Sequence, residues 1–144
     1  VIVPQELLMQ ARKIQTIFNI VLGCIAGISL LVGGIGIMNT MLASVAERTK
    51  EIGIRRSIGA NRIHITVQFL SESIALTLLG GCIGIALGVG SAYIISIIAG
   101  WRTVVTLWSM VISLGMAASV GVVSGLYPAV KAAHLDPVKA LRHA

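Results

Sequence analysis

Three long uncharged segments alternate with short charged ones along this chain. The uncharged segments cover residues 14–46, 73–101 and 103–130, which are 33, 29 and 28 residues long. A helix needs about 20 apolar residues to cross ~30 Å of hydrocarbon, so each segment suffices for one crossing. None has the ~40 residues that two crossings and a turn would need. The pattern predicts an all-α integral membrane protein with three transmembrane helices.

The composition supports this prediction and excludes a water-soluble domain. Hydrophobic residues make up 56% of the 144 residues and charged residues only 11%, whereas soluble domains carry roughly 25% charge. A disordered chain is poor in apolar residues, so it is excluded as well. The two cysteines, Cys24 and Cys82, lie in apolar segments. We interpret them as small buried hydrophobic residues rather than as a disulfide or a metal pair.

The distribution of lysine and arginine predicts the orientation of the helices. Eight of these residues lie in the connection after the first segment and in the tail, residues 131–144, against three on the other side. Because cytoplasmic loops carry an excess of lysine and arginine, we expect the connection and the C-terminus to be cytoplasmic and the N-terminus to be outside. The net charge of +6 then reflects membrane topology, and no nucleic-acid partner is predicted.

The first segment is longer than a membrane is thick, since 33 residues form about 50 Å of helix. Residues 5–13 continue the helical pattern upstream, with Pro4 as a start signal. We therefore expect residues 1–13 to project outside the membrane as a stalk. The alternatives are a strongly tilted helix or a helix broken at residues 33–36. The chain begins without Met or a signal peptide although its N-terminus is predicted outside, so we expect it to be part of a longer protein.

Small residues in the three segments indicate where the helices pack. In lipid, helices associate through small faces that let their backbones approach closely. Three sets of glycines recur at every fourth residue and are predicted to pack helices together: Gly23 with Gly27, Gly80 with Gly84 and Gly88, and Gly121 with Gly125. The triple set is the preferred prediction, and the sequence leaves open whether it packs within one chain or between two copies.

The segments lack the ionisable residues that many transporters and enzymes place inside a membrane. No Asp, Lys, Arg or His lies within them, and Glu72 stands at a boundary. This pattern argues against ion-coupled transport and against an intramembrane hydrolase, so no catalytic residue and no metal site is predicted. Glu72 is either a functional intramembrane acid or an interfacial acid paired with a nearby Arg or Lys.

The connection between the first two segments, residues 47–60, carries the most informative sequence. Arg48, Glu51 and Arg55 have helical spacing, which places Glu51 between two cations. In one interpretation this short helix lies under lipid headgroups, and in the other it docks into a cytoplasmic protein. Two glutamates weaken the first interpretation because anionic headgroups repel them, and interleaved charges fit a protein groove better.

Helix-boundary signals surround this short helix. Ile52 and Ile58 are predicted to give it an apolar side. Gly59 is a natural residue after a helix C-terminus, and Asn61 is a natural N-cap for the next helix. Residues 61–101 are therefore predicted to form an amphipathic lead-in followed by the second transmembrane helix.

The tail also carries a helix-start signal. Asp136 is a natural N-cap and Pro137 a natural first helical residue, so we expect a short helix that runs through Arg142. This helix is either a solvated basic end that enforces the membrane topology or an element close to a cytoplasmic partner.

Several stretches of the chain resemble a known family. Residues 31–42, followed by residues 45–55 and 58–60, are similar to the FtsX-like permease domain of MacB-type ABC transporters. Residues 127–142 resemble the closing motif of that family, and Glu72 stands where family members carry an acid. The resemblance covers nearly the whole chain. It implies that the chain holds the second to fourth helices of a four-helix permease, whose extracytoplasmic domain lies between the first two helices.

The resemblance also implies a function. The connection would be a coupling helix that sits in a groove of an ABC ATPase through Glu47, Arg48, Lys50, Glu51, Ile52, Gly53, Ile54, Arg55 and Arg56. Closure of two ATPases on ATP would then move a homodimer of permeases and their extracytoplasmic domains, which is mechanotransmission. In MacB-type members this motion drives efflux of macrolides, peptides or toxins, together with a periplasmic adaptor and an outer-membrane duct.

Location and cofactors follow from the same resemblance. It implies a multi-pass protein of the bacterial inner membrane, with ATP and Mg²⁺ held by the partner ATPase and no cofactor in this chain. No Gly-x-x-x-x-Gly-Lys-Ser/Thr phosphate loop occurs, so the chain is not expected to be an enzyme by itself. Two alternatives remain, a permease that regulates cell-wall hydrolases or extracts lipoproteins, and a membrane scaffold without an ATPase. The sequence leaves open the substrate and whether the ATPase is fused or separate.

Overall fold

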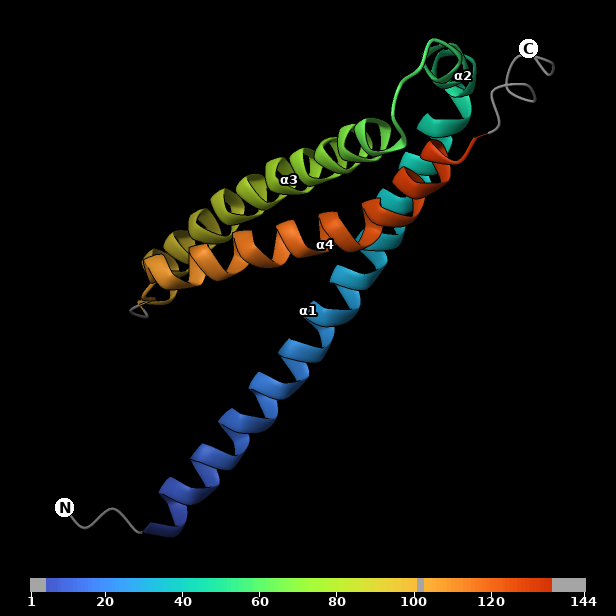
Figure 1. The fold of residues 1–144 in the computed structure, drawn as a ribbon. Coiled ribbons are helices and arrows are strands. Elements are labelled where there is room, and N and C mark those ends of the chain that lie inside the picture. The colour runs from blue at the N-terminus through green and yellow to red at the C-terminus, as the bar shows by residue number, and fades with distance from the viewer. Residues whose placement is uncertain (1–4, 101–102, 136–144) are drawn as a thin grey trace. The chain divides into compact units, whose positions relative to one another are not determined.

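The computed structural model describes residues 5–100 and 103–135, and this part of the chain contains four helices and no strand (Figure 1). The helices are α1 (Gln5–Glu47), α2 (Thr49–Ser57), α3 (Arg62–Ala99) and α4 (Leu107–Ala133). The prediction of an all-α protein is confirmed. Three of the helices, α1, α3 and α4, are long and apolar enough to cross a membrane, and they contain most of the three segments predicted to do so. Their orientation in a membrane stays a prediction.

The first helix is continuous. α1 has 43 residues and passes through the glycines of residues 33–36 without interruption, so the alternative of a broken helix is wrong. A helix of this size is about 65 Å long, which exceeds the ~30 Å of a hydrocarbon core. The chain divides into two compact units, Val1–Gly33 and Gly34–Ala144. In the first unit, apolar side chains such as Leu7, Phe18 and Ile25 are exposed.

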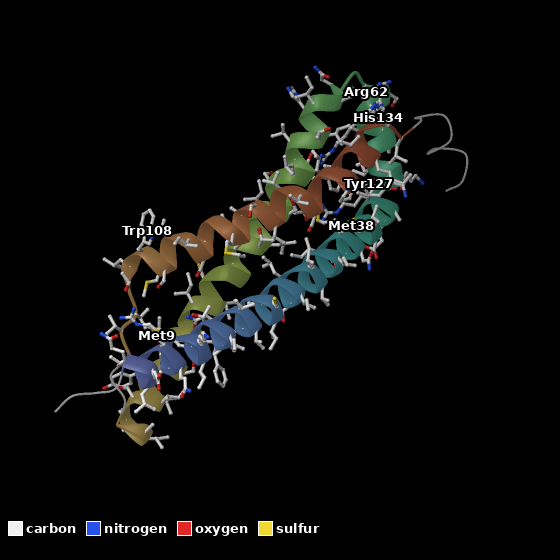
Figure 2. The ribbon with its side chains drawn as sticks, turned by 90° about the horizontal axis from the view of Figure 1, so that it is seen from below. Met9, Met38, Arg62, Trp108, Tyr127 and His134 are labelled. Carbon is white, nitrogen blue, oxygen red and sulfur yellow. The ribbon has the colours of Figure 1, made fainter. Side chains whose placement is uncertain are left out.

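In the second unit, α3 and α4 lie side by side as an antiparallel pair (Figure 1). α3 ends at Ala99, and its C-cap residue Gly100 adopts the left-handed conformation with φ 66° that favours glycine. Just before α4, the Thr103 hydroxyl donates a hydrogen bond of 3.0 Å to the carbonyl of Ala92 in α3. Figure 2 labels Arg62 and His134 at one end of the pair and Trp108 at the other.

A buried apolar cluster joins α2 to the other helices of the second unit. Its members come from all four helices: Met41 and Val45 of α1, Ile52 of α2, Ile65 and Phe69 of α3, and Ala129, Ala132 and Ala133 of α4. Burying an isoleucine side chain contributes roughly 1.5–3 kcal/mol. Ile52, which is only 4% exposed, therefore anchors α2 at the place where the helices meet.

The boundaries of α2 follow the sequence signals. Gly59 has φ 104° directly after the C-cap residue Ile58, and the Asn61 side chain accepts a hydrogen bond of 3.3 Å from the Ile63 backbone N–H. Both boundary predictions are confirmed. The predicted apolar pairing of Ile52 with Ile58 is wrong, because Ile58 is 82% exposed. Ile58 still bonds to the Ile54 carbonyl in the helical pattern, but residues six positions apart lie on different sides of a helix.

The prediction that both cysteines are buried is also wrong. Cys24 in α1 and Cys82 in α3 are free and exposed. The error has a physical reason. An apolar run signals burial inside a soluble protein, but in a helix of transmembrane length the same run is compatible with a face turned toward lipid.

Candidate functional site

The nine residues predicted for coupling lie at one junction between α1 and α3, which we call the α2 junction. Two of them, Ile52 and Gly53, are buried, and Arg56 is half-buried. The others are exposed: Glu47, Arg48, Lys50, Glu51, Ile54 and Arg55. α2 therefore packs one side against the protein and turns another side outward.

Arg48 connects the junction to α3. It lies between α1 and α2, and its Nη1 is 3.4 Å from the Oε2 of Glu72. The sequence predicts Glu51 between two cations, but Arg48 pairs with Glu72 instead, and this part of the prediction is wrong. Arg48 is the N-cap residue of α2, with φ −93° and ψ 10°. Both side chains are more than a third exposed, and such pairs contribute about 0–1 kcal/mol. In this arrangement the interfacial acid is paired with a cation.

Arg55 makes a second connection to α3. Its Nη2 lies 2.5 Å from the Oε1 of Glu51, in the i,i+4 pairing that the spacing predicts, and its Nη1 donates to the Oε1 of Gln68 at 3.0 Å. Pairs of this type contribute a few tenths of a kcal/mol on an exposed helix. The main consequence of these two contacts is positional, because one guanidinium holds α2 against α3.

Arg56 connects the junction to α4. Its Nη1 donates to the carbonyl of Ala133 at 2.6 Å and to the carbonyl of Leu135 at 3.2 Å. Carbonyls in the last turn of a helix have no intrahelical donor, and a cation there complements the helix dipole. Arg56 was predicted as part of a coupling set, but its acceptors are backbone atoms 77 and 79 residues away. No side-chain pattern in the sequence marks them.

The predicted glycines divide into packed and open positions. Gly121 and Gly125 of α4 are buried against α3. A β-carbon added at Gly121 would lie 3.0 Å from the Cα of Ile74, and one added at Gly125 would collide with the Ser73 side chain. The Ser73 hydroxyl lies 3.0 Å from the Gly121 carbonyl and 2.8 Å from the Leu70 carbonyl of its own helix, so these two acceptors share its one proton. Glycine is therefore what lets α4 approach α3 at this point.

The other predicted glycines contact nothing in the described chain. An added β-carbon would have no atom within 4 Å at Gly23, Gly27, Gly80, Gly84 or Gly88. Gly81 faces α4 instead of Gly80, because a β-carbon there would lie 3.0 Å from the Cβ of Ala117. A role of the triple set between two copies of the chain stays a prediction.

Sequence reasoning missed the hydroxyl residues of this contact. Ser73 and Thr77 on α3 and Ser124 on α4 are buried, and a β-carbon on Gly34 of α1 would lie 2.8 Å from the Ser124 hydroxyl. The signal was present, since Ser73 and Thr77 are four residues apart, as are Gly121 and Gly125. Serine and threonine belong with glycine among the small residues of membrane helix contacts.

Comparison with known proteins identifies the family. The model of the FtsX-like permease C-terminal region matches residues 23–137. The macrolide export ATP-binding/permease protein MacB of Bdellovibrio bacteriovorus is 56% identical over 87% of this chain, and that of Syntrophobacter fumaroxidans is 45% identical over 96%. The ABC transporter permease YknZ of Bacillus subtilis, described as uncharacterized, is 52% identical over 96%.

The relatives are longer than this chain. The chain spans 19% of the length of each of these two MacB proteins and 35% of the length of YknZ. The matched residues include all of α2, α3 and α4 and most of α1. The chain therefore belongs to the FtsX-like permease family and is similar to MacB-type ABC transporter permeases.

Proposed function

We propose that this chain is the membrane part of a MacB-type ABC exporter and that α2 is the helix through which an ATPase moves it. The observation that carries the proposal is the two-sided character of α2. One side is bonded to α3 through Arg55 and to α4 through Arg56, with Ile52 in the buried cluster. The other side is exposed and is available to a partner.

The exposed side of α2 has the chemistry of a protein-docking surface. It combines Lys50 with Ile54, which is 43% exposed, and with Ile58, which is 82% exposed. An apolar side chain beside charged ones is typical of an anchor with a polar rim. A lipid surface would accept the lysine but would repel the glutamates at positions 47 and 51.

A displacement of α2 has routes into the membrane helices. A single residue, Arg48, separates α2 from α1, and Arg55 and Arg56 lead to α3 and α4. α1 is about 65 Å long, so a helix with its C-terminal end in the cytoplasm would pass through the membrane and reach beyond it. This is the geometry that mechanotransmission requires, with α2 cytoplasmic and residues 1–13 outside.

The partners follow from this mechanism. The ATPase binds ATP and Mg²⁺, and a second copy of the permease completes a homodimer in the bacterial inner membrane. A periplasmic adaptor and an outer-membrane duct would receive the exported macrolide, peptide or toxin. Some relatives are named as ATP-binding/permease proteins and another as a permease alone, so the proposal covers a fused or a separate ATPase.

Charge and polarity changes on the exposed side of α2 test the proposal. The double variant Lys50→Glu with Ile58→Glu in the native protein should reduce permease-stimulated ATP hydrolysis at least about tenfold, which corresponds to about 1.4 kcal/mol of lost docking energy. The change replaces the lysine charge and the apolar anchor without touching Ile52 or the arginine contacts. The measurement is steady-state ATP hydrolysis in nanodiscs over a range of ATP concentrations.

The matched control is Lys131→Glu, which reverses an exposed charge in the last turn of α4. This variant should keep the stimulation of the parent protein. Stimulation that survives the double variant at the parent level would contradict the assignment of α2 as the coupling helix.

A further inference from the structure

Arg56 makes a contact that differs in kind from those of its neighbours in the α2 junction. Arg48 and Arg55 pair with carboxylates, and their side chains are nearly half exposed. Arg56 is half-buried and donates to backbone carbonyls of another helix end. A contact to backbone depends on where the helix is and not on which side chains it carries.

The contact completes the end of α4. The carbonyl of Val130 accepts from the His134 backbone N–H at 3.1 Å, and that of Ala132 accepts from the Leu135 N–H at 3.3 Å. For Ala133, the donor is Arg56, which also reaches Leu135. A cation at this end is favoured by the helix dipole as well. The way α4 ends is therefore set partly by a residue of α2.

α2 is joined to α3 and to α4 in different ways. After Ser57, the chain passes through Gly59 and Asn61 into α3, so α2 is joined to α3 covalently. α4 has no such connection and contacts α2 through Arg56 and through the apolar cluster that contains Ile52. Both hydrogen bonds of Arg56 come from one nitrogen, so a single guanidinium links α2 to the carboxyl end of α4 beside this cluster.

We propose that Arg56 is a positioning residue that links α2 to the carboxyl end of α4, so that a displacement of α2 moves α4 together with α3. The inference rests on the proposed function for the source of the displacement. The contact itself is independent of that function and can be measured without nucleotide.

Spin labels report the contact directly. The native protein carries Cys24→Ser and Cys82→Ser, with labels on the exposed positions Ser57→Cys in α2 and Lys131→Cys in α4. It is diluted with unlabelled protein so that only distances within one chain are measured in nanodiscs. We expect one narrow distance distribution in the parent and a width at least doubled in Arg56→Gln. An unchanged width in Arg56→Gln overturns the proposal.

Single labels report the transmission. With a label at Ser57→Cys alone or Lys131→Cys alone, addition of ATP and vanadate should change the mobility of both labels in the parent. In Arg56→Gln, the response at position 57 should persist, while the response at position 131 falls by at least half. A full response at position 131 overturns the proposal and leaves the function of α2 intact. No response at position 57 in the parent overturns the function instead, and the distance width then decides the contact alone.

Two variants separate positioning from a loss of folding. Arg56→Lys retains a cation and N–H donors within reach of the same carbonyls, so it should restore at least part of the response at position 131. Arg62→Gln removes an exposed arginine that lies outside the coupling set and should leave that response at the parent level. Failure of Arg56→Lys to restore any response, or an equal loss in Arg62→Gln, overturns the specific role of Arg56.

Discussion

α3 carries small residues in two regions, and within residues 5–100 and 103–135 one of them packs against another helix while the other does not. At Ser73 and Thr77, α3 meets Gly121 and Gly125 of α4, and all four residues are buried. At Gly80, Gly84 and Gly88, an added β-carbon would meet nothing. Glycine spacing alone therefore does not locate a helix contact. The packed region combines glycines on one helix with hydroxyl side chains on the other.

The physical difference is a hydrogen bond added to close approach. In lipid there is no hydrophobic drive between helices, so packing and interhelical hydrogen bonds supply the association. Ser73 donates to the Gly121 carbonyl of the facing helix, which only a close approach permits. The triple glycine set has the close-approach surface without such a partner in the described chain. Its apolar surroundings suit lipid or a second copy equally.

The largest expected effect comes from a bulky residue in the packed region. Gly125→Leu places a side chain where the Ser73 side chain lies, so we expect a loss of about 3 kcal/mol in the free energy of unfolding. The measurement is the unfolding midpoint of the native protein in mixed detergent micelles. The matched control, Gly84→Leu, adds the same side chain at an open position and should leave the midpoint within error.

Equal midpoints for the two variants would remove the distinction between packed and open regions. The Gly84→Leu control also tests whether the triple glycine set packs between two copies of the chain. If Gly84→Leu leaves the unfolding midpoint unchanged but dissociates the proposed homodimer, the triple glycine set packs between copies. If the proposed homodimer is unaffected, that face is assigned to lipid.

An intermediate effect is expected from the smallest change in the packed region. Gly121→Ala would put a methyl group 3.0 Å from the Cα of Ile74, which is backbone and cannot rotate away. We expect a net loss of about 1 kcal/mol, because crowding outweighs the gain in helix propensity. Gly115→Ala is the control in the same helix, and its methyl group would meet nothing within 4 Å. It should be neutral or stabilising, so the same sign for both would contradict the packing.

The smallest effect is expected from the hydrogen bond alone. Ser73→Ala removes the bond to the Gly121 carbonyl and leaves the glycines in place. Such bonds average about 0.6 kcal/mol in membrane proteins. Ser71→Ala is the matched control, since the Ser71 hydroxyl is exposed and bonds only within its own helix, to Gln68. A loss as large as that of Gly125→Leu would show that the bond, and not close approach, holds the pair.

Most of the helices and their boundaries could be predicted from the sequence. The segment lengths predicted the three helices of membrane-spanning length. Gly59 predicted the C-terminal end of α2, and Asn61 predicted the start of α3. These features depend on a few neighbouring residues. The continuity of α1 through residues 33–36 was the preferred prediction and is confirmed, although the glycines there had left a break as an alternative.

The contacts of the α2 junction could be predicted from the sequence only where both partners are close in the chain. The pair of Glu51 with Arg55 follows from i,i+4 spacing. Arg48 has the same charge and similar spacing, but it pairs with Glu72 on α3. Arg56 finds backbone acceptors at the end of α4. Such partners depend on how α3 and α4 return to the α2 junction, which no local pattern encodes.

Photo-cross-linking at the exposed side of α2 shows whether this side contacts an ATPase. A photo-cross-linking amino acid replaces the exposed Ile58 in the native protein, in membranes, with Lys131 as the control position. Docking of α2 predicts an adduct between position 58 and the ATPase, with less at position 131. Adducts at position 58 that contain only lipid would contradict a coupling role for α2 and favour a helix that lies under the headgroups.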